Sequence, residues 1–302
     1  MARRARELVG LEHDTLLIDG TAISMPDTAE NQARFPRPGS QEPGVGFPQA
    51  RLVGLLCATS GTLVDMALSA CKGKGSDEAT ALRALSADVA PGTVLIGDAI
   101  YENYWTWTTL LEAGCEGIFE INGSRFLGGR ERKRRHVTIR RPSRPMWMTI
   151  EQYRSLPTSV TLRVVISRRK GYRDKTLLTS MLDHASCPNA RVRERHARRW
   201  DVELDFRSIK DVLGARVLAC RTPQMVIKEL WTHLLGYNLI RLLACEAARA
   251  HGCEPREISF RHTEQLWSAW AMLGEELDER RWEALLARIA QRRVRNRPGR
   301  RE

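Results

Sequence analysis

The chain has 302 residues, 42% of them hydrophobic, which is enough to bury the core of one large domain with or without an insertion. This composition excludes a disordered chain. Lysine and arginine outnumber aspartate and glutamate by 48 to 36, giving a formal net charge of +12. Such an excess favours a polyanionic partner such as nucleic acid, although an arginine-rich composition alone would also produce it.

The seven cysteines show no CxxC pair and no Cys/His ligand spacing, so they indicate reduced, mostly buried thiols. No apolar run approaches the roughly 20 residues that a membrane span needs. The first ten residues lack the hydrophobic centre of a signal peptide. We therefore expect a cytoplasmic protein.

The first half of the chain begins with strands. After a short basic segment, 1–13, the sequence TLLIDGTAIS (15–24) is apolar and β-branched and predicts a buried strand. Residues 25–49 are rich in proline and glycine and predict a loop. Two further apolar runs, 50–59 and 62–70, flank a Ser-Gly turn, so we expect a three-stranded antiparallel meander.

Helices and strands alternate after the meander. Ser76 is a suitable N-cap for a helix, and the runs that follow predict a strand over 93–99, a helix over 102–113 and a strand over 116–121. The resulting order is βββαβαβ. This order resembles the ribonuclease-H-like fold, an α/β class with a mixed sheet and flanking helices.

The residue pattern changes twice in the second half of the chain. Residues 122–182 contain a basic run and short alternating stretches, which predict a β-rich insertion. Helical periodicity returns over 189–213 and over 223–250, where it is apolar almost all round and indicates a core helix. Residues 251–302 predict a helical C-terminal extension that ends in a basic tail. The main domain is therefore expected to span 14–250.

The basic run of the insertion is a candidate DNA-facing surface. It contains four consecutive cations: Arg132, Lys133, Arg134 and Arg135. Clusters of this kind neutralise phosphates well. The alternative is an ordinary solvated hairpin.

Two aspartates stand at the ends of predicted strands. Asp19 ends the apolar part of the first strand, and Asp98 ends the fourth. A charged group at such a position is costly to bury unless something pairs it. Two carboxylates at adjacent strand ends would repel each other and form a natural site for a hard divalent cation. Singly, each could equally be a turn or cap residue.

A predicted helix carries a third acid among bases. At about 100° per residue, His196, Arg199, Glu203 and Lys210 fall within an arc of about 60° on one helix face. We expect apolar neighbours to fix this helix against the sheet, namely Trp200, Leu204, Phe206, Ile209 and Leu213. The alternative is that this polar face is an ordinary solvated surface, on which Arg199 and Glu203 form an i,i+4 ion pair.

Three blocks of the sequence together resemble insertion-sequence-4 family transposases. HARRWDVELDFRSIKDVLG matches the signature Tyr-x2-Arg-x3-Glu-x6-Lys at Arg199, Glu203 and Lys210. The segment beginning LLIDGTAIS resembles the first-aspartate block of that family, and VLIGDAIYENYWTWTTLLEAG resembles the second. The resemblance covers about residues 14–250.

The resemblance implies a DDE mechanism. Asp19, Asp98 and Glu203 would be catalytic and would hold two Mg²⁺ ions, for which Mn²⁺ can substitute. The enzyme would cleave transposon-end DNA and join it to target DNA, while His196, Arg199 and Lys210 contact phosphates. The family further implies double-stranded DNA as partner, a homodimer in the DNA complex and a place at the bacterial nucleoid.

The sequence departs from the family pattern at three points. His196 stands where the signature has tyrosine, and an imidazole ordinarily titrates near neutrality. Ala99 follows the second aspartate where many relatives have a basic residue. The segment before the first strand is also short. Two alternatives therefore remain open: a catalytically impaired DNA-binding remnant that regulates transposition, and a ribonuclease-H-like nuclease that cuts without joining.

Overall fold

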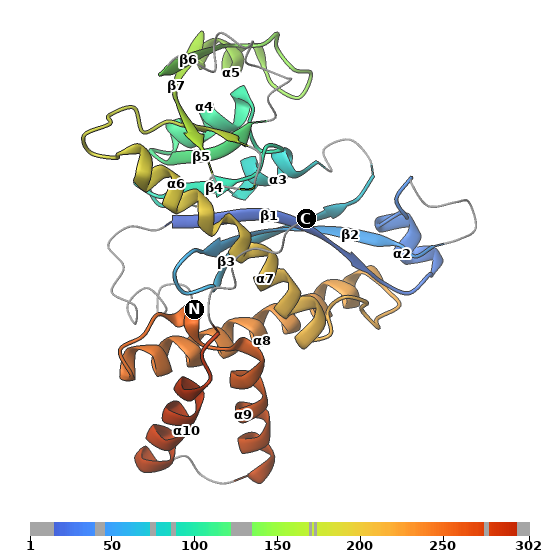
Figure 1. The fold of residues 1–302 in the computed structure, drawn as a ribbon. Coiled ribbons are helices and arrows are strands. Elements are labelled where there is room, and N and C mark those ends of the chain that lie inside the picture. Colours follow the sequence, from blue (N-terminus) through green and yellow to red (C-terminus); the bar gives the residue numbers. More distant parts are fainter. Residues whose placement is uncertain are drawn as a thin grey trace.

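The computed structural model describes residues 15–39, 46–72, 77–85, 89–121, 135–168, 171, 174–274 and 278–294. They form one mixed eight-stranded sheet with helices on both faces (Figure 1). The strands are β1 (Thr15–Ser24), β2 (Gln49–Cys57), β3 (Leu63–Ala70), β4 (Val94–Gly97), β5 (Glu116–Ile121), β6 (His136–Arg140), β7 (Ser159–Ser167) and β8 (Lys175–Thr179). Their spatial order is β3-β2-β1-β4-β5-β8-β7-β6.

The first five strands have the predicted order, and the first three have the predicted antiparallel pairing. β1, β2 and β3 form the antiparallel meander, and β4 and β5 lie parallel to β1. Helices α3 (Glu78–Leu85) and α4 (Tyr104–Glu112) make the crossovers. The predicted cap Ser76 lies outside the described residues. Within the predicted loop there is a short helix, α2 (Ala29–Arg34), which the Thr28 side chain caps by accepting from Asn31 N.

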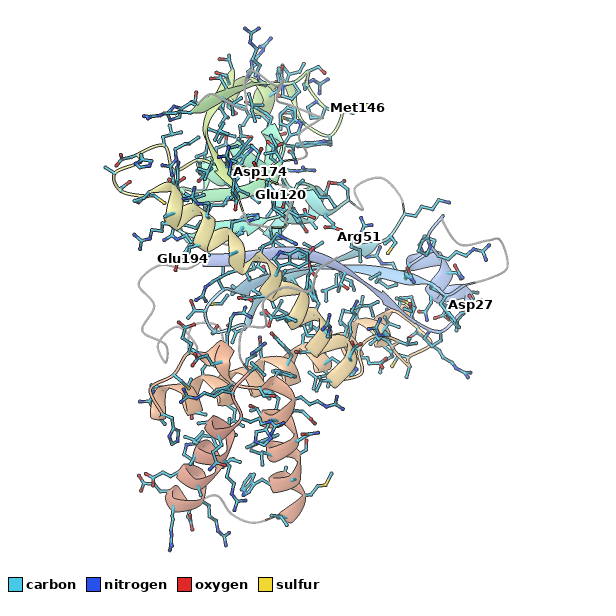
Figure 2. The ribbon with its side chains drawn as sticks, viewed as in Figure 1. Asp27, Arg51, Glu120, Met146, Asp174 and Glu194 are labelled. Carbon is cyan, nitrogen blue, oxygen red and sulfur yellow. The ribbon has the colours of Figure 1, made fainter. Side chains whose placement is uncertain are left out.

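The β-rich segment does not form a sheet of its own. β8 pairs antiparallel with β5, and β7 and β6 follow it, so these strands extend the main sheet at one edge. Helix α5 (Ile150–Ser155) lies in the same segment. The exposed Met146 projects from this end of the molecule (Figure 2).

The predicted helix over 189–213 is divided into four parts. These are α6 (Asn189–Ala197), a 3₁₀ turn η3 (Arg198–Trp200), α7 (Asp201–Arg207) and a π-helical turn η4 (Ser208–Val212). Phe206 and Ile209 are buried as predicted, but Trp200 and Leu204 are 48% and 53% exposed. The tighter 3₁₀ turn alters the phase of the helix, which accounts for the outward position of Trp200.

The C-terminal part is helical, as the sequence predicts. It comprises α8 (Pro223–Ala250), the 3₁₀ turn η5 (Pro255–Glu257), α9 (Phe260–Leu273) and α10 (Glu279–Gln291). Helices α9 and α10 project away from the sheet as a pair, with α8 between them and the strands (Figure 1). Leu243, Leu286 and Ile289 belong to the core that joins α8 to this pair.

Alternate residues of β1 supply two cores. Leu16 and Ile18 pack with α3 and α4, whereas Leu17 and Ile23 pack with α6, α7 and α8. This alternation follows from the period of two in a strand. None of the seven cysteines forms a disulfide, and none of the described helices is long and apolar enough to cross a membrane.

Candidate active site

Asp19 and Asp98 lie side by side at neighbouring parallel strands. In the β1–β4 register, Leu16 faces Leu95 and Leu17 faces Ile96. Continued by two residues, the same register places Asp19 opposite Asp98. Both side chains then fall on the sheet face that packs against α6, α7 and α8, because residues two apart in a strand share a face.

The Asp19 carboxyl is difficult to ionise in this position. Its pKa is raised to about 6, chiefly by burial, with a further contribution from the charge of Asp98. A hydrogen bond from Gly20 N to Oδ1, at 2.8 Å, and the nearby Arg199 guanidinium act in the opposite direction. Bound positive charge would therefore relieve an unfavourable interaction between the two aspartates.

Glu203 stands over the same sheet face on α7. Phe206 packs this helix against the sheet: its Cζ atom lies 3.4 Å from the position that a Cβ on Gly54 would occupy. Gly54 is the β2 residue that pairs with Asp19. The Glu203 carboxylate accepts a hydrogen bond from Arg199 Nη2 at 3.2 Å. Arg199 is 7% exposed and acts electrostatically on both Glu203 and Asp19. A single guanidinium thus partly balances two of the three acids.

Lys210 also reaches this face of the sheet. It lies in the π-helical turn η4, and its Nζ donates a hydrogen bond to Thr21 Oγ1 at 2.8 Å. Thr21 is two residues beyond Asp19 on β1, so the ammonium group stands beside the carboxylate centre. Partial burial lowers the pKa of Lys210. π-helical turns of this kind are frequent at functional sites.

His196 does not titrate near neutrality, contrary to the expectation from its side chain alone. It is 6% exposed, and its pKa is lowered to about 3 by burial and by the charges of Lys175 and Arg199. Among the residues that the structure describes, its Nε2 finds no hydrogen-bond partner. At neutral pH the imidazole is uncharged, so any contact with a phosphate would use an N–H donor without full positive charge.

Of the predicted basic run, one residue lies within the described part of the chain. Arg132, Lys133 and Arg134 lie outside the described residues. Arg135 is exposed immediately before β6, the edge strand, and β4, β5, β8 and β7 separate that strand from β1. Arg135 therefore does not belong to the carboxylate centre.

A further acid, Glu78 of α3, borders the centre and is not indicated by the sequence pattern. Its carboxylate occupies the space where a Cβ on Gly20 would be, accepts a hydrogen bond from Tyr101 Oη at 2.7 Å and lies 3.7 Å from Arg51 Nε. Arg51 extends from β2 (Figure 2). The charge of Glu78 contributes to the raised pKa of Asp19. No local signal distinguishes Glu78 from an ordinary acid in the first turn of a helix.

The three predicted acids are a suitable donor set for a hard divalent cation, since all are carboxylates and two repel each other. In the described residues, however, no group of three His, Cys, Asp or Glu side chains is close enough to hold a metal ion. Glu203 is paired with Arg199 instead. Its carboxylate would have to exchange this partner to complete the set.

Comparisons with known proteins identify related sequences. The family model described as "Transposase DDE domain" matches residues 10–239. The chain is 29% identical over 251 residues to the transposase InsG for insertion sequence element IS4 of Escherichia coli (strain K12), covering 81% of this chain and 55% of that protein. The chain thus spans about half the length of this curated relative.

A solved structure supports the fold. A cryo-EM structure of the piggyBac transposase synaptic complex with hairpin DNA superposes with a TM-score of 0.50 at 11% identity, covering 98% of this chain and 61% of that one. The order of strands and crossovers confirms the predicted ribonuclease-H-like α/β class. DDE transposases are in general dependent on divalent metal ions. By the extent of the family match, this chain belongs to the transposase DDE domain family.

Proposed function

We propose that this chain is the catalytic part of a DNA transposase, which cleaves transposon ends and transfers the cut strand into target DNA. The observation that carries the proposal is the β1–β4 register, which aligns Asp19 with Asp98 beneath the helix of Glu203. The family membership and the similarity to InsG support the same reaction.

The three carboxylates would hold two Mg²⁺ ions, with Mn²⁺ as a substitute. When bound, these ions would lower the pKa of water and stabilise the charge that develops on the departing 3′ oxygen. Asp19 lies in the middle of β1, where it pairs with Gly54 of β2, and not at the strand end that the apolar pattern predicts. Asp98 follows the last residue of β4. Glu203 lies on the helix above and has more freedom, since its side chain is 42% exposed.

Arg199 and Lys210 would position the DNA backbone beside the acids. Arg199 is paired with Glu203, and Lys210 with Thr21. A DNA phosphate offers Lys210 a charged acceptor in place of the neutral Thr21 hydroxyl. It offers the planar Arg199 guanidinium two oxygens for parallel hydrogen bonds, where Glu203 accepts one. Transfer of Arg199 to a phosphate would free the Glu203 carboxylate for metal binding.

Double-stranded DNA is the partner, and the net charge of +12 supports this assignment. Cut-and-paste transposition requires two DNA ends to be held together, so we propose a homodimer in the DNA complex and action at the nucleoid. The exposed cation Arg135, together with the run that precedes it, would extend the phosphate-binding surface.

The test is metal-dependent cleavage of a labelled duplex that carries the element's own end, comparing the wild-type chain with Glu203→Gln. We expect cleavage to require Mg²⁺ or Mn²⁺, to be lost in Glu203→Gln and to produce a joined strand when target DNA is added. DNA binding by Glu203→Gln should remain, because the amide keeps the size of the side chain.

Two other outcomes would redirect the assignment. DNA binding without cleavage by the wild-type chain would identify a regulatory remnant. Cleavage that never yields a strand-transfer product would identify a nuclease.

A further inference from the structure

A buried carboxylate lies on the back of the helix that carries Glu203. Asp205 is 0% exposed and, at about 100° per residue, is directed away from Glu203. Its Oδ1 accepts from Arg241 Nη2 at 2.6 Å, and its Oδ2 accepts from Arg256 Nη2 at 2.9 Å. Arg256 Nη1 also donates to Oδ1 at 3.2 Å. We refer to Asp205, Arg241 and Arg256 as the Asp205 clamp.

Arg256 connects the clamp to the strands of the active site. Its Nη2 donates to the carbonyl of Cys57 at 3.0 Å and its Nε to the carbonyl of Ala58, at the end of β2. Ala58 N in turn donates to the carbonyl of Thr15, at the start of β1, at 2.8 Å. One guanidinium therefore holds α7 and the end of the β1–β2 pair together.

Arg241 makes a second connection to the same turn. Its Nε donates to Tyr237 Oη at 3.1 Å, and Tyr237 Oη donates to the carbonyl of Gly61 at 2.6 Å. Gly61 has a φ of +73°, and a Cβ there would come within 2.9 Å of Arg241 Nε. The turn between β2 and β3 is thus shaped to receive this arginine.

We infer that the Asp205 clamp is a positioning device that sets the distance between Glu203 and the two strand aspartates. The inference rests on the proposed function. The helix is held from behind by two arginines, which are themselves held by the strands that carry or border Asp19. Because α7 has only seven residues between a 3₁₀ turn and a π turn, its own hydrogen bonds cannot define its placement alone.

The clamp also gives the C-terminal part of the chain a role in the active site. The family match ends at residue 239, and both Arg241 and Arg256 follow it. Asp201 Oδ2 lies 3.8 Å from Arg256 Nε, so two acids of α7 face two arginines from α8 and η5. The four charges balance, which permits the burial of Asp205 and Arg241.

The experiment measures Mn²⁺ binding by calorimetry and by electron paramagnetic resonance, together with the Mn²⁺ dependence of DNA cleavage, in the full chain. For Asp205→Asn we expect the half-saturating Mn²⁺ concentration to rise about tenfold in both measurements. Cleavage should recover at high Mn²⁺, and DNA affinity should stay within about twofold of wild type. Arg256→Lys keeps the positive charge but loses the planar guanidinium with its several donors, so we expect a smaller rise in the half-saturating Mn²⁺ concentration.

Two controls separate positioning from stability and from loss of charge. Leu286→Ala removes a buried side chain of α10 and should lower the melting temperature without changing half-saturation. Asp174→Asn makes the same acid-to-amide change in an exposed pair with Arg168 and should change neither quantity. If Asp205→Asn does not fold, Arg256→Lys is compared with the same controls.

The inference is overturned if the folded clamp variant binds Mn²⁺ like wild type while its melting temperature falls like that of Leu286→Ala. That result would leave the proposed function intact. A wild-type chain that binds no Mn²⁺ with or without DNA would instead overturn the proposed function, and the inference with it.

Discussion

The Asp19 carboxyl opposes folding when it is ionised. Its pKa is about 6 in the folded chain, against an ordinary value near 3.8, so the folded state holds a proton that the unfolded state has released. Stability therefore falls as pH rises from about 4 to 6 and remains lower above that range. The difference corresponds to at most about 3 kcal/mol.

We predict that Asp19→Asn stabilises the metal-free chain by about 1–3 kcal/mol at pH 8 and changes little at pH 4, while it abolishes cleavage. Urea unfolding in the presence of a chelator at the two pH values measures this effect. Asp174→Asn, in an exposed pair, is the control and should stay within about 0.5 kcal/mol of wild type. A destabilised Asp19→Asn at pH 8 would contradict the prediction.

His196 has the opposite pH dependence. Its pKa is about 3 in the folded state and near 6.5 when unfolded, so the unfolded chain takes up a proton first as the pH falls. The contribution of the neutral imidazole to stability is complete above about pH 6.5 and is lost below it, amounting to about 3 kcal/mol by pH 4.

We predict that His196→Phe, which keeps a planar ring and removes an unpartnered nitrogen, reduces the loss of stability between pH 7 and pH 4. The free energy of unfolding, measured across that range, should decline less steeply than in wild type. His184→Phe, at an exposed position, should leave the slope unchanged. Parallel curves for His196→Phe and wild type would show that the buried imidazole is not the cause.

At the level of elements, the contact of β4 with β1 depends on the absence of a side chain. A Cβ on Gly97 would lie 2.8 Å from Ile18 Cγ2 and 2.9 Å from Tyr101 Cδ2. Gly97 immediately precedes Asp98, so any shift that relieves the overlap would also move one of the proposed catalytic acids.

We predict that Gly97→Ala destabilises the chain by about 1–3 kcal/mol, as overpacking does, and lowers the affinity for Mn²⁺. Gly236→Ala is the matched control, because Gly236 lies within α8 and a Cβ there would have nothing within 4 Å. That change should stabilise the chain by about 0.5–1 kcal/mol. Equal effects of the two substitutions would argue against a tight β1–β4 contact.

The order of elements was predictable because its signals are local. Apolar runs bounded by turn residues predict β1 to β5 correctly, and the run over 223–250, which is apolar almost all round, predicts α8. The pairing of β8 with β5 was not predictable, because strand partners distant in sequence leave no local mark. The interruptions at η3 and η4 were missed because the sequence keeps a nearly regular helical pattern through them.

The site was predictable only where a family signature or a strand end marks a residue. Asp19, Asp98 and Glu203 are brought to one sheet face, although their catalytic roles stay a prediction. The burial of Asp205 could not be predicted from the sequence, because an acidic residue in an amphipathic helix is usually exposed. Arg241 offered a signal: a single charge within the apolar run NLIRLLAC requires a buried partner.

For the whole molecule, the C-terminal helices are part of the folding unit. A chain that ends after Ala250 would lack Arg256 and the helices that cover Leu243. Removing one partner of a buried charge network costs about 3–5 kcal/mol, and the exposed core adds to that loss. This is a large fraction of the stability of a typical domain.

We predict that the chain ending at residue 250 is mostly insoluble and shows no cooperative thermal transition by circular dichroism. A chain ending at Val294 keeps every described helix and should melt like the full chain. A soluble 1–250 chain that melts within a few degrees of the full chain would show that the region after α8 is a separate unit.

The position of the clamp arginines in the sequence has a consequence for synthesis on the ribosome. Asp19 emerges early, and a domain generally folds as a unit once its parts have been synthesised. Arg256 comes last among the residues that fix α7, well after Glu203. A growing chain would therefore hold its three acids without a defined separation until translation has passed Arg256. Premature termination before that point would release a protein with the acids but without the means to align them.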